Sequence, residues 1–352
     1  MTNKKNRIEW IDYLKAFACI LVVLGHLLQS FQKSNIDNNQ NITSFIIWFI
    51  YLFHMPVFFC ISGYLYERGK KEFSWSNYKK FEIKKIINLV IPYVTFYLLF
   101  VGINMMFSDS VNNPRGIQDI LNMFNNPMAP YWFLYALLSI FIAMPLIEKI
   151  FKDKKYIILL VLLLLKVTSI FIKTNIYFLD SIFSNAIYFY IGNFINIKIN
   201  NTETKKIKQI MYNVLLTLGY LVIALVIYAN IDRINENILE LIKIVLAIGG
   251  TYICISIFRN VKKSKILDTM KQYTFPIYLL HTIFAAGVRI VLFKLGIRNY
   301  VIHFIIGLMA SIYAPVLVGI ICEKIKYLNF FFYPIKTVKE IKEKKKKETL
   351  GE

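Results

Sequence analysis

All four histidines of the sequence lie inside long apolar segments: His26, His54, His281 and His303. An ionisable side chain in such a segment is costly unless it is paired or faces a wet cavity, so each is a candidate functional residue. Histidine is also the side chain best suited to exchange protons near neutral pH. A single neutral histidine could simply hydrogen-bond a neighbouring helix as part of the packing. Four together favour a chemical role for at least one.

The segment DYLKAFACILVVLGHLLQSF, residues 12–31, places a lysine and a histidine on one face of a predicted helix. Lys15 and His26 are eleven residues apart, about three helical turns, so they share a helix face roughly 16 Å apart along the axis. Asp12 lies one turn before Lys15, close enough to pair with it. An anionic donor with a long arm could be held at the lysine and react at the histidine. The alternative for Lys15 is that its ammonium group extends to the membrane surface.

The composition identifies the class of protein that must position these residues. The chain has 352 residues, is 57% hydrophobic and has a mean hydropathy of +0.52, which is too apolar for a soluble domain. The apolar residues form blocks of about 20, the length that crosses a bilayer as a helix. We therefore predict an all-α integral membrane protein with about ten transmembrane helices. They begin near Ile11, Thr43, Ile86, Tyr131, Tyr156, Ile176, Ile210, Asn237, Tyr273 and Tyr300.

The organisation of the chain is simple. The first apolar segment carries Asp12 and Lys15 and shows no small-residue cleavage site, so we interpret it as a retained helix rather than a signal peptide. The sixth and ninth segments, which contain Asp180 and Arg289, are the most polar. Residues 1–330 are predicted to form one membrane domain, and residues 331–352 a basic cytoplasmic tail.

The net charge of +21 follows the membrane topology rather than a nucleic-acid surface. With the N-terminus in the cytoplasm and ten spans, the inner segments hold 32 of the 42 Lys and Arg residues, the outer segments hold 6, and 4 lie within spans. This positive-inside pattern predicts that both termini are cytoplasmic. The basic tail is most simply an anchor at anionic lipid headgroups of the inner leaflet, with a specific binding partner as the alternative.

The four cysteines all fall in apolar segments, and none has the spacing of a metal site: Cys19, Cys60, Cys254 and Cys322. A buried free cysteine behaves as a small apolar residue. We expect neither a disulfide nor a bound metal, and no permanently bound cofactor.

Four motifs in order resemble one family of proteins. The first segment, with Lys15 and the run Leu24-Gly25-His26, looks like the first-helix signature of the type-three membrane acyltransferases, in which an Arg or Lys precedes a His by ten residues or so. The closest branch is similar to fucose and capsule-polysaccharide O-acetyltransferases. The other matching motifs are FHMPVFFCISGYLY (53–66), PYWFLYALLSIFIAMPLIEKI (130–150) and YTFPIYLLHTIF (273–284).

The resemblance implies a fold of about ten helices and transfer of an acyl group, usually acetyl from acetyl-CoA, to a sugar hydroxyl. It implies that His26 is catalytic and that the cation at Lys15 helps to bind the donor. The family's Arg-x-x-Arg pair before the third helix would fall on Lys85 and Asn88, so the second cation is missing; Lys84 or Lys80 could replace it. No esterase-like domain follows the last helix, so we expect the chain to complete the transfer itself or to hand the acyl group to a partner.

The chemistry also fits the residues themselves. Transfer from a thioester to an alcohol needs a group that takes the hydroxyl proton or accepts the acyl group, and one histidine can do either. The developing oxyanion needs a donor, for which Tyr and Trp side chains such as Trp132, or the Ser62-Gly63 turn, are candidates. We predict His26 as the catalytic residue, and His303 as packing. The predicted substrate-binding residues are Lys15, Asp12, His54, Lys85, Trp132 and His281.

A transporter is the main alternative, either a flippase or an exporter of a lipid-linked sugar or polysaccharide. Many spans and buried ionisable residues suit it equally, but the sequence shows no paired halves with matching broken helices. A membrane assembly subunit without its own chemistry is a third possibility. The Ile-, Lys- and Asn-rich composition indicates an AT-rich bacterial gene, and so a multi-pass protein of a bacterial plasma membrane.

Overall fold

The computed structural model is helical throughout the part of the chain that it describes, with no strand there. That part comprises residues 8–36, 39–195, 203–261 and 265–349. Several of the predicted inner-side cations lie outside the described residues: Lys4, Lys5, Arg7, Lys198, Lys262 and Lys263.

Each of the ten apolar segments forms a helix. The helices are α1 (Glu9–Lys33), α2 (Gln40–Gly69), α3 (Trp75–Met106), α5 (Trp132–Ile150), α6 (Lys155–Phe171), α7 (Tyr177–Ile191), α8 (Glu203–Ala229), α9 (Glu236–Phe258), α11 (Thr274–Lys294) and α12 (Tyr300–Lys324). Eight are long and apolar enough to cross a membrane, whereas α6 and α7 have only 17 and 15 residues. Fifteen residues rise about 22 Å, less than the ~30 Å of a hydrocarbon core. The predicted count of ten spans is therefore not confirmed, although the all-helical class is.

Polar residues just before the apolar segments define where several helices begin. The side chains of Asn39, Ser74 and Asn299 each accept a hydrogen bond from the backbone N–H three residues later. Such caps satisfy backbone donors that have no partner inside the helix. The starts of α2, α3 and α12 are thus encoded locally.

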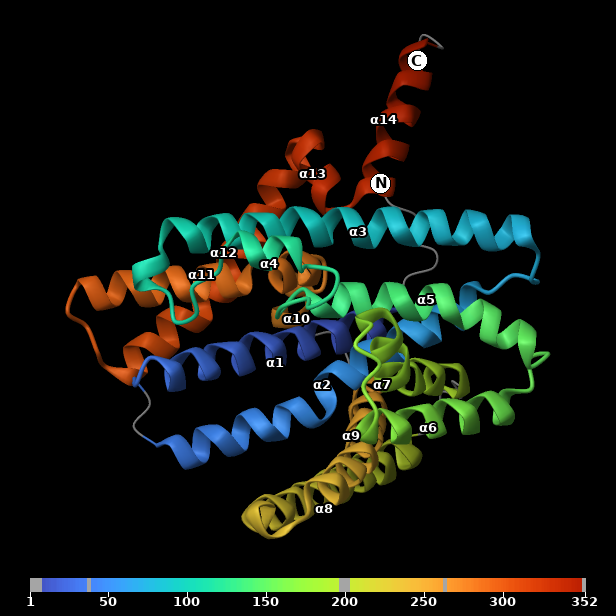
Figure 1. Ribbon diagram of the computed structural model, residues 1–352, viewed down its shortest axis with the longest axis horizontal. Coiled ribbons are helices and arrows are strands. Elements are labelled where there is room, and N and C mark those ends of the chain that lie inside the picture. Colours follow the sequence, from blue (N-terminus) through green and yellow to red (C-terminus); the bar gives the residue numbers. More distant parts are fainter. Residues whose placement is uncertain (1–7, 37–38, 196–202, 262–264, 350–352) are drawn as a thin grey trace.

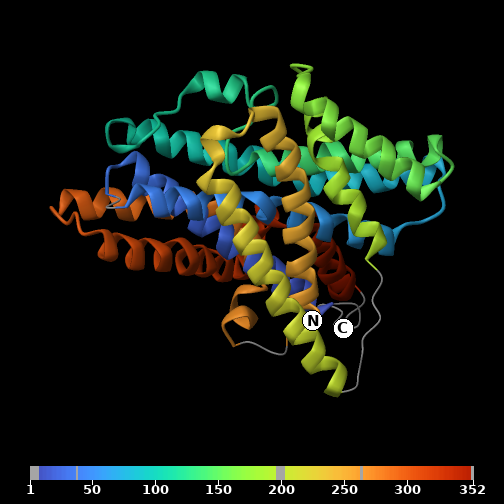
Figure 2. The same cartoon turned by 90° about the horizontal axis from the view of Figure 1, so that it is seen from below.

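The helices surround α1 and α2. Helices α11 and α12 run side by side as a pair that packs against α1 (Figure 1), while α8 and α9 form a second pair that crosses beside α2 (Figure 2). Helices α5 and α7 complete the packing on the other side, α7 against α2 and α5 against α3 and α7. Short helices α4 (Ile117–Leu121), α10 (Lys265–Met270), α13 (Lys326–Phe332) and α14 (Pro334–Thr349) connect or follow the long ones.

A very close contact between backbones joins α2 to the end of α7. A Cβ atom added at Gly63 would lie 1.8 Å from the carbonyl oxygen of Phe189, and one added at Gly192 would lie 2.2 Å from that of Cys60. Only glycine fits at either position. Ser62-Gly63 is therefore a packing element in the middle of α2 and not a turn: Ser62 Oγ donates to the Phe58 carbonyl at 2.8 Å. This corrects its prediction as an oxyanion donor.

The tail predicted at residues 331–352 does not leave the membrane domain at once. Helices α13 and α14 pack on α3, and the Ile335 backbone N–H donates to Asn88 Oδ1 at 3.3 Å. Thr337 is fully buried. The remainder of α14 projects away from the bundle (Figure 1).

Candidate functional site

A cavity of about 750 Å³ opens between α1, α2, α5, α6, α7, α9 and α11. Three predicted site residues, His26, His54 and Trp132, line it together. A fourth, His281, lies directly behind, because its ring centroid is 5.2 Å from that of His26. Segments more than 250 residues apart thus meet at one place.

Tyr51 joins the histidines into one group. Its ring centroid is 6.4 Å from that of His26 and 4.8 Å from that of His54. The ring lies against Gly25, where an added Cβ would be 2.6 Å from a Tyr51 ring carbon. Glycine beside the histidine is therefore what allows the tyrosine to reach this position.

The hydrogen bonds of two histidines determine their tautomers. His281 Nδ1 lies 2.8 Å from the Tyr278 carbonyl, and His54 Nδ1 lies 2.9 Å from the Ile50 carbonyl. A carbonyl only accepts, so each Nδ1 carries the proton and each Nε2 is left as an acceptor. His281 Nε2 is buried with no partner among the described residues. This Nε2 atom can accept a hydrogen bond from a protonated ring nitrogen of His26 and so orient that ring.

The cavity also presents donors that the sequence analysis missed. Tyr51 Oη and Trp48 Nε1 are buried without a hydrogen-bond partner in the described residues, and both side chains line the cavity. A buried unpaired donor is costly unless a ligand satisfies it. The spacing of Trp48, Tyr51 and His54 at i, i+3 and i+6 places them on roughly one face of α2, which is the signal that could have indicated them.

Pro56 adds a backbone feature to this wall. Proline has no N–H, so it cannot make the helical bond to the Leu52 carbonyl. Pro56 and Leu52 both line the cavity.

A smaller cavity of about 200 Å³ lies on the other side of His26, which lines both. Its walls come from α1, α3, α11 and the segment between α3 and α5. Arg289 donates to Ser30 Oγ at 2.6 Å and to Ser34 Oγ at 3.1 Å there, and Asn112 donates to the Ser30 carbonyl at 3.1 Å. The segment between α3 and α5 is thus folded against the end of α1.

The remaining predicted binding residues lie elsewhere. Lys15, Lys85 and Asp12 line neither cavity. Lys85 Nζ lies 3.6 Å from the ring centroid of Phe141 on α5, a cation–π contact. Lys15 lies close enough to Lys85 for their charges to repel, and buried Glu82 offsets this from one turn before Lys85.

A third cavity, of about 270 Å³, lies at this opposite end of α2 and α3, and four lysines line it: Lys70, Lys71, Lys80 and Lys84. It therefore includes both lysines that were predicted to replace the missing family cation. Lys70 bonds Asp153 at 2.6 Å and Glu148 at 3.1 Å. Burial opposes its charge, but these hydrogen bonds raise its pKa above the ordinary value, so it stays cationic.

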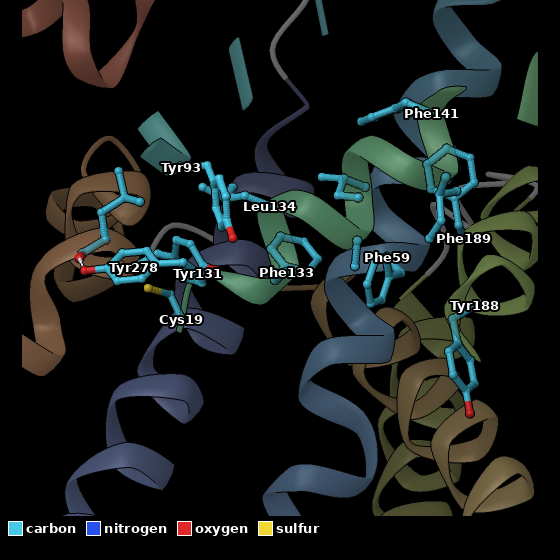
Figure 3. Close-up of a cluster of buried hydrophobic side chains, with 14 of the residues drawn as sticks. Cys19, Phe59, Tyr93, Tyr131, Phe133, Leu134, Phe141, Tyr188, Phe189 and Tyr278 are labelled. Carbon is cyan, nitrogen blue, oxygen red and sulfur yellow. Dashed lines mark hydrogen bonds between the residues drawn. The ribbon is translucent and has the colours of Figure 1, made fainter. Parts of the chain in front are cut away.

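A packed barrier separates the histidine cavity from the lysine cavity. Pro56 lines the first and Tyr66 the second, ten residues or about 15 Å apart along α2. Most side chains between them are buried, Phe59 completely. Figure 3 shows the aromatic layer, in which Cys19 of α1 lies beside Tyr131 and Tyr278.

His303 stands apart from both histidine cavities. Its Nε2 lies 2.9 Å from the Ile297 carbonyl, and its ring packs against Phe31 and Phe293. This arrangement agrees with a packing role. The four cysteines are free and buried, and the described residues contain no group of three metal-binding side chains.

Comparison with known proteins relates the chain to a protein family and to a curated protein. The profile of a family described as an acyltransferase domain matches residues 8–320, which include every residue of the two histidine cavities. The nodulation protein NolL of Sinorhizobium fredii is 31% identical over 137 residues, 39% of this chain and 36% of that protein. The chain thus matches about a third of the length of that curated relative. No solved structure matches it.

Proposed function

The chain belongs to this acyltransferase family, and on that premise we propose that it moves an acetyl group from cytoplasmic acetyl-CoA to a hydroxyl of a cell-surface or lipid-linked carbohydrate. The observation that carries the proposal is the group of His26, His281 and Tyr51 at the junction of two cavities. Family membership favours this enzyme over the flippase or exporter hypothesis, which no specific observation supports.

His26 is the proposed base or acyl carrier. In direct transfer, the acceptor oxygen attacks the thioester carbonyl while His26 takes the hydroxyl proton; the carbon–sulfur bond breaks, and the proton passes to the thiolate of CoA. In the covalent alternative, a ring nitrogen of His26 attacks the thioester carbonyl and displaces the thiolate of CoA, which leaves an acyl-imidazolium. The acceptor hydroxyl then attacks this acyl group, the acyl–nitrogen bond breaks, and the hydroxyl proton passes to the thiolate. In either case His281 Nε2, which has no partner among the described residues, is the proposed acceptor for the other ring nitrogen of His26.

Tyr51 is the proposed oxyanion donor, because its buried hydroxyl has no other partner in the described residues. Trp48 and Trp132 are the proposed walls for the acceptor sugar, since sugar rings present apolar faces and both indoles line the larger cavity.

The lysine cavity is the proposed site for the phosphates of the donor. Lys80 and Lys84 supply the charge there. Lys85, which contacts the Phe141 ring, and Lys15, which is close enough to Lys85 to affect its charge, lie outside the lining of this cavity. The acyl-bearing arm of the donor would have to pass the layer around Cys19 and Tyr278 to reach His26. The positive-inside pattern predicts that these lysines face the cytoplasm, near anionic lipids of the inner leaflet of a bacterial membrane.

Label transfer tests the proposal. The purified protein in lipid nanodiscs, given acetyl-CoA with a labelled acetyl group and a carbohydrate acceptor, should release CoA thiol and label the acceptor. His26→Gln should abolish both signals, because Gln can hydrogen-bond but is neither an effective base nor a nucleophile.

His303→Gln is the matched control, since it makes the same change in a histidine outside both cavities. It should retain normal turnover. Near-normal turnover of His26→Gln would show that His26 is structural, and the catalytic assignment would fail.

A further inference from the structure

The cavities at His26 concentrate cations that the sequence otherwise keeps out of the membrane. Only four Lys or Arg residues lie within the expected spans, and three of them line these cavities. Lys166 and Lys243 line the larger cavity and Arg289 the smaller one; the fourth is Lys15. Charge in a span is costly, so such clustering indicates a function.

The charges around His26 do not balance. Five cationic side chains line the two cavities, against one carboxylate. The cations are Lys33, Arg115, Lys166, Lys243 and Arg289, and the carboxylate is Glu240. Arg115 bonds Asp119 at 2.8 Å and Lys243 bonds Glu240 at 2.7 Å. Lys33, Lys166 and Arg289 form no ion pair within the described part of the chain.

Arg289 is the most informative of the three. It is 4% exposed, and its partners are the neutral hydroxyls of Ser30 and Ser34, both bonded through Nη1. A buried charge is normally neutralised by a partner, which these hydroxyls cannot do. Its other donors stay available, and the planar guanidinium matches a carboxylate or phosphate group.

Other groups in the smaller cavity are also unsatisfied. Asn104 Oδ1 and Thr282 Oγ1 are buried without a partner among the described residues, and both side chains line this cavity. Ser30, which holds Arg289, is one turn beyond His26 on α1. An anion at Arg289 would therefore lie in the cavity that His26 also lines.

We propose that the acceptor is an anionic carbohydrate, whose carboxylate or phosphate binds at Arg289 and Lys33 in the smaller cavity. Lys166 attracts the same class of molecule in the larger cavity. This inference rests on the proposed function, because it names the substrate class of that site. It requires no donor to be bound, so the two can be tested separately.

The quenching of tryptophan fluorescence measures acceptor binding without any donor, because Trp48 and Trp132 line the larger cavity. The probes are methyl glucoside, methyl glucuronide and glucose 1-phosphate, titrated into the full chain in nanodiscs. The two anionic sugars should bind roughly tenfold or more tightly than the neutral one. If neither anionic sugar binds more tightly than methyl glucoside, the proposal is overturned.

Arg289→Gln should abolish the preference for anions, and Arg289→Lys should restore part of it. Arg298→Gln, the same change at an exposed arginine that lines neither cavity, should leave it intact. Equal weakening of all three sugars by Arg289→Gln would show that the arginine only braces α11 on α1, and would overturn the assignment.

Coenzyme A is the other source of a phosphate group, so its binding to the wild-type protein and to Arg289→Gln is the last measurement of the experiment. Arg289→Gln should leave its binding unchanged. If the variant weakens coenzyme A binding instead of sugar binding, the anion belongs to the donor and the proposal fails. Absence of label transfer with normal sugar binding would contradict the proposed function alone.

Discussion

The histidine cavities at one end of the bundle and the lysine cavity at the other hold their polar groups in different ways. Around His26, the acceptor Nε2 of His281 and the hydroxyl of Tyr51 are buried without partners in the described chain. At the other end, Lys70 already bonds Glu148 and Asp153. The first site presents polar groups that no described residue pairs, whereas those of the second are partly paired within the protein itself.

This difference separates two kinds of contribution to catalysis. Groups that gain a partner only as the reaction proceeds stabilise the transition state and affect kcat. Groups that exchange existing ion pairs for donor phosphates affect mainly binding and therefore KM. We expect substitutions at the two ends to divide along this line.

Removal of the His26 imidazole should have the largest effect. His26→Ala should lower turnover ~10²–10⁴-fold if the residue is a general base, and more deeply if it carries the acyl group. A single Ala in place of a polar residue should not impair membrane insertion. Turnover and chromatographic homogeneity are the measurements. Trapping a labelled acyl-enzyme from donor alone would establish the covalent route, and normal turnover with a well-folded variant would remove the histidine end from the mechanism.

A substitution at Tyr51, beside His26, tests whether the histidine end of the bundle stabilises the transition state. Tyr51→Phe keeps the ring against Gly25 and removes only the hydroxyl. Loss of an oxyanion donor typically costs ~10²–10³-fold, so kcat should fall by that order with KM for the sugar nearly unchanged. Tyr313→Phe, at an exposed tyrosine of α12, is the control. A rise in KM at constant kcat would assign Tyr51 to acceptor binding instead.

Substitutions at the lysine end should weaken the affinity for the donor, and by a smaller factor than the effects at His26 and Tyr51. Lys15→Ala should raise the apparent KM for acetyl-CoA about 10–100-fold, the scale of one hydrogen bond to a charged group. Lys15→Arg should keep substantial activity, because an anion site needs the charge most. Steady-state kinetics with Lys208→Ala, an exposed lysine of α8, as control would measure this. An unchanged KM for Lys15→Ala would mean that its ammonium only reaches toward the membrane surface.

The last prediction concerns no activity. It tests whether the lysine end of the bundle faces the cytoplasm and the histidine end the outside. All four native cysteines are buried, so single added cysteines report cleanly. Lys79→Cys should be shielded from an impermeant maleimide in intact cells, and Asn125→Cys should be labelled. The reverse pattern would overturn the orientation and with it the assignment of donor and acceptor ends.

Sequence reasoning located the helices well because their signal is local. Length and apolarity mark each segment, and caps such as Asn39 and Ser74 mark where helices begin. The site was only partly predictable. His26, His54 and His281 stand out as ionisable residues in apolar segments, but their meeting at one cavity depends on helix packing. Because Tyr51 resembles the many other aromatic residues, nothing marked its hydroxyl as unpaired.

The same limit applies to two further features. Ser62-Gly63 looks like a flexible pair in sequence, yet its glycine is needed for contact with the Phe189 carbonyl. The start of the basic tail is held on α3 by the hydrogen bond from the Ile335 backbone N–H to Asn88, a contact that its composition does not indicate. Each depends on a neighbour that is distant in sequence, which no local pattern records.

Pro56 has a consequence for any attempt to redesign the acceptor specificity of this protein. Side chains such as Trp48 and Trp132 can be exchanged one by one to reshape the larger cavity. The Leu52 carbonyl is different, because it is freed from its helical partner by the proline four residues on, and it belongs to no side chain. Any hydrogen bond that this carbonyl accepts from the proposed acceptor would survive every substitution at Leu52 and be lost with Pro56→Ala, so a screen confined to side chains that contact the sugar would overlook it.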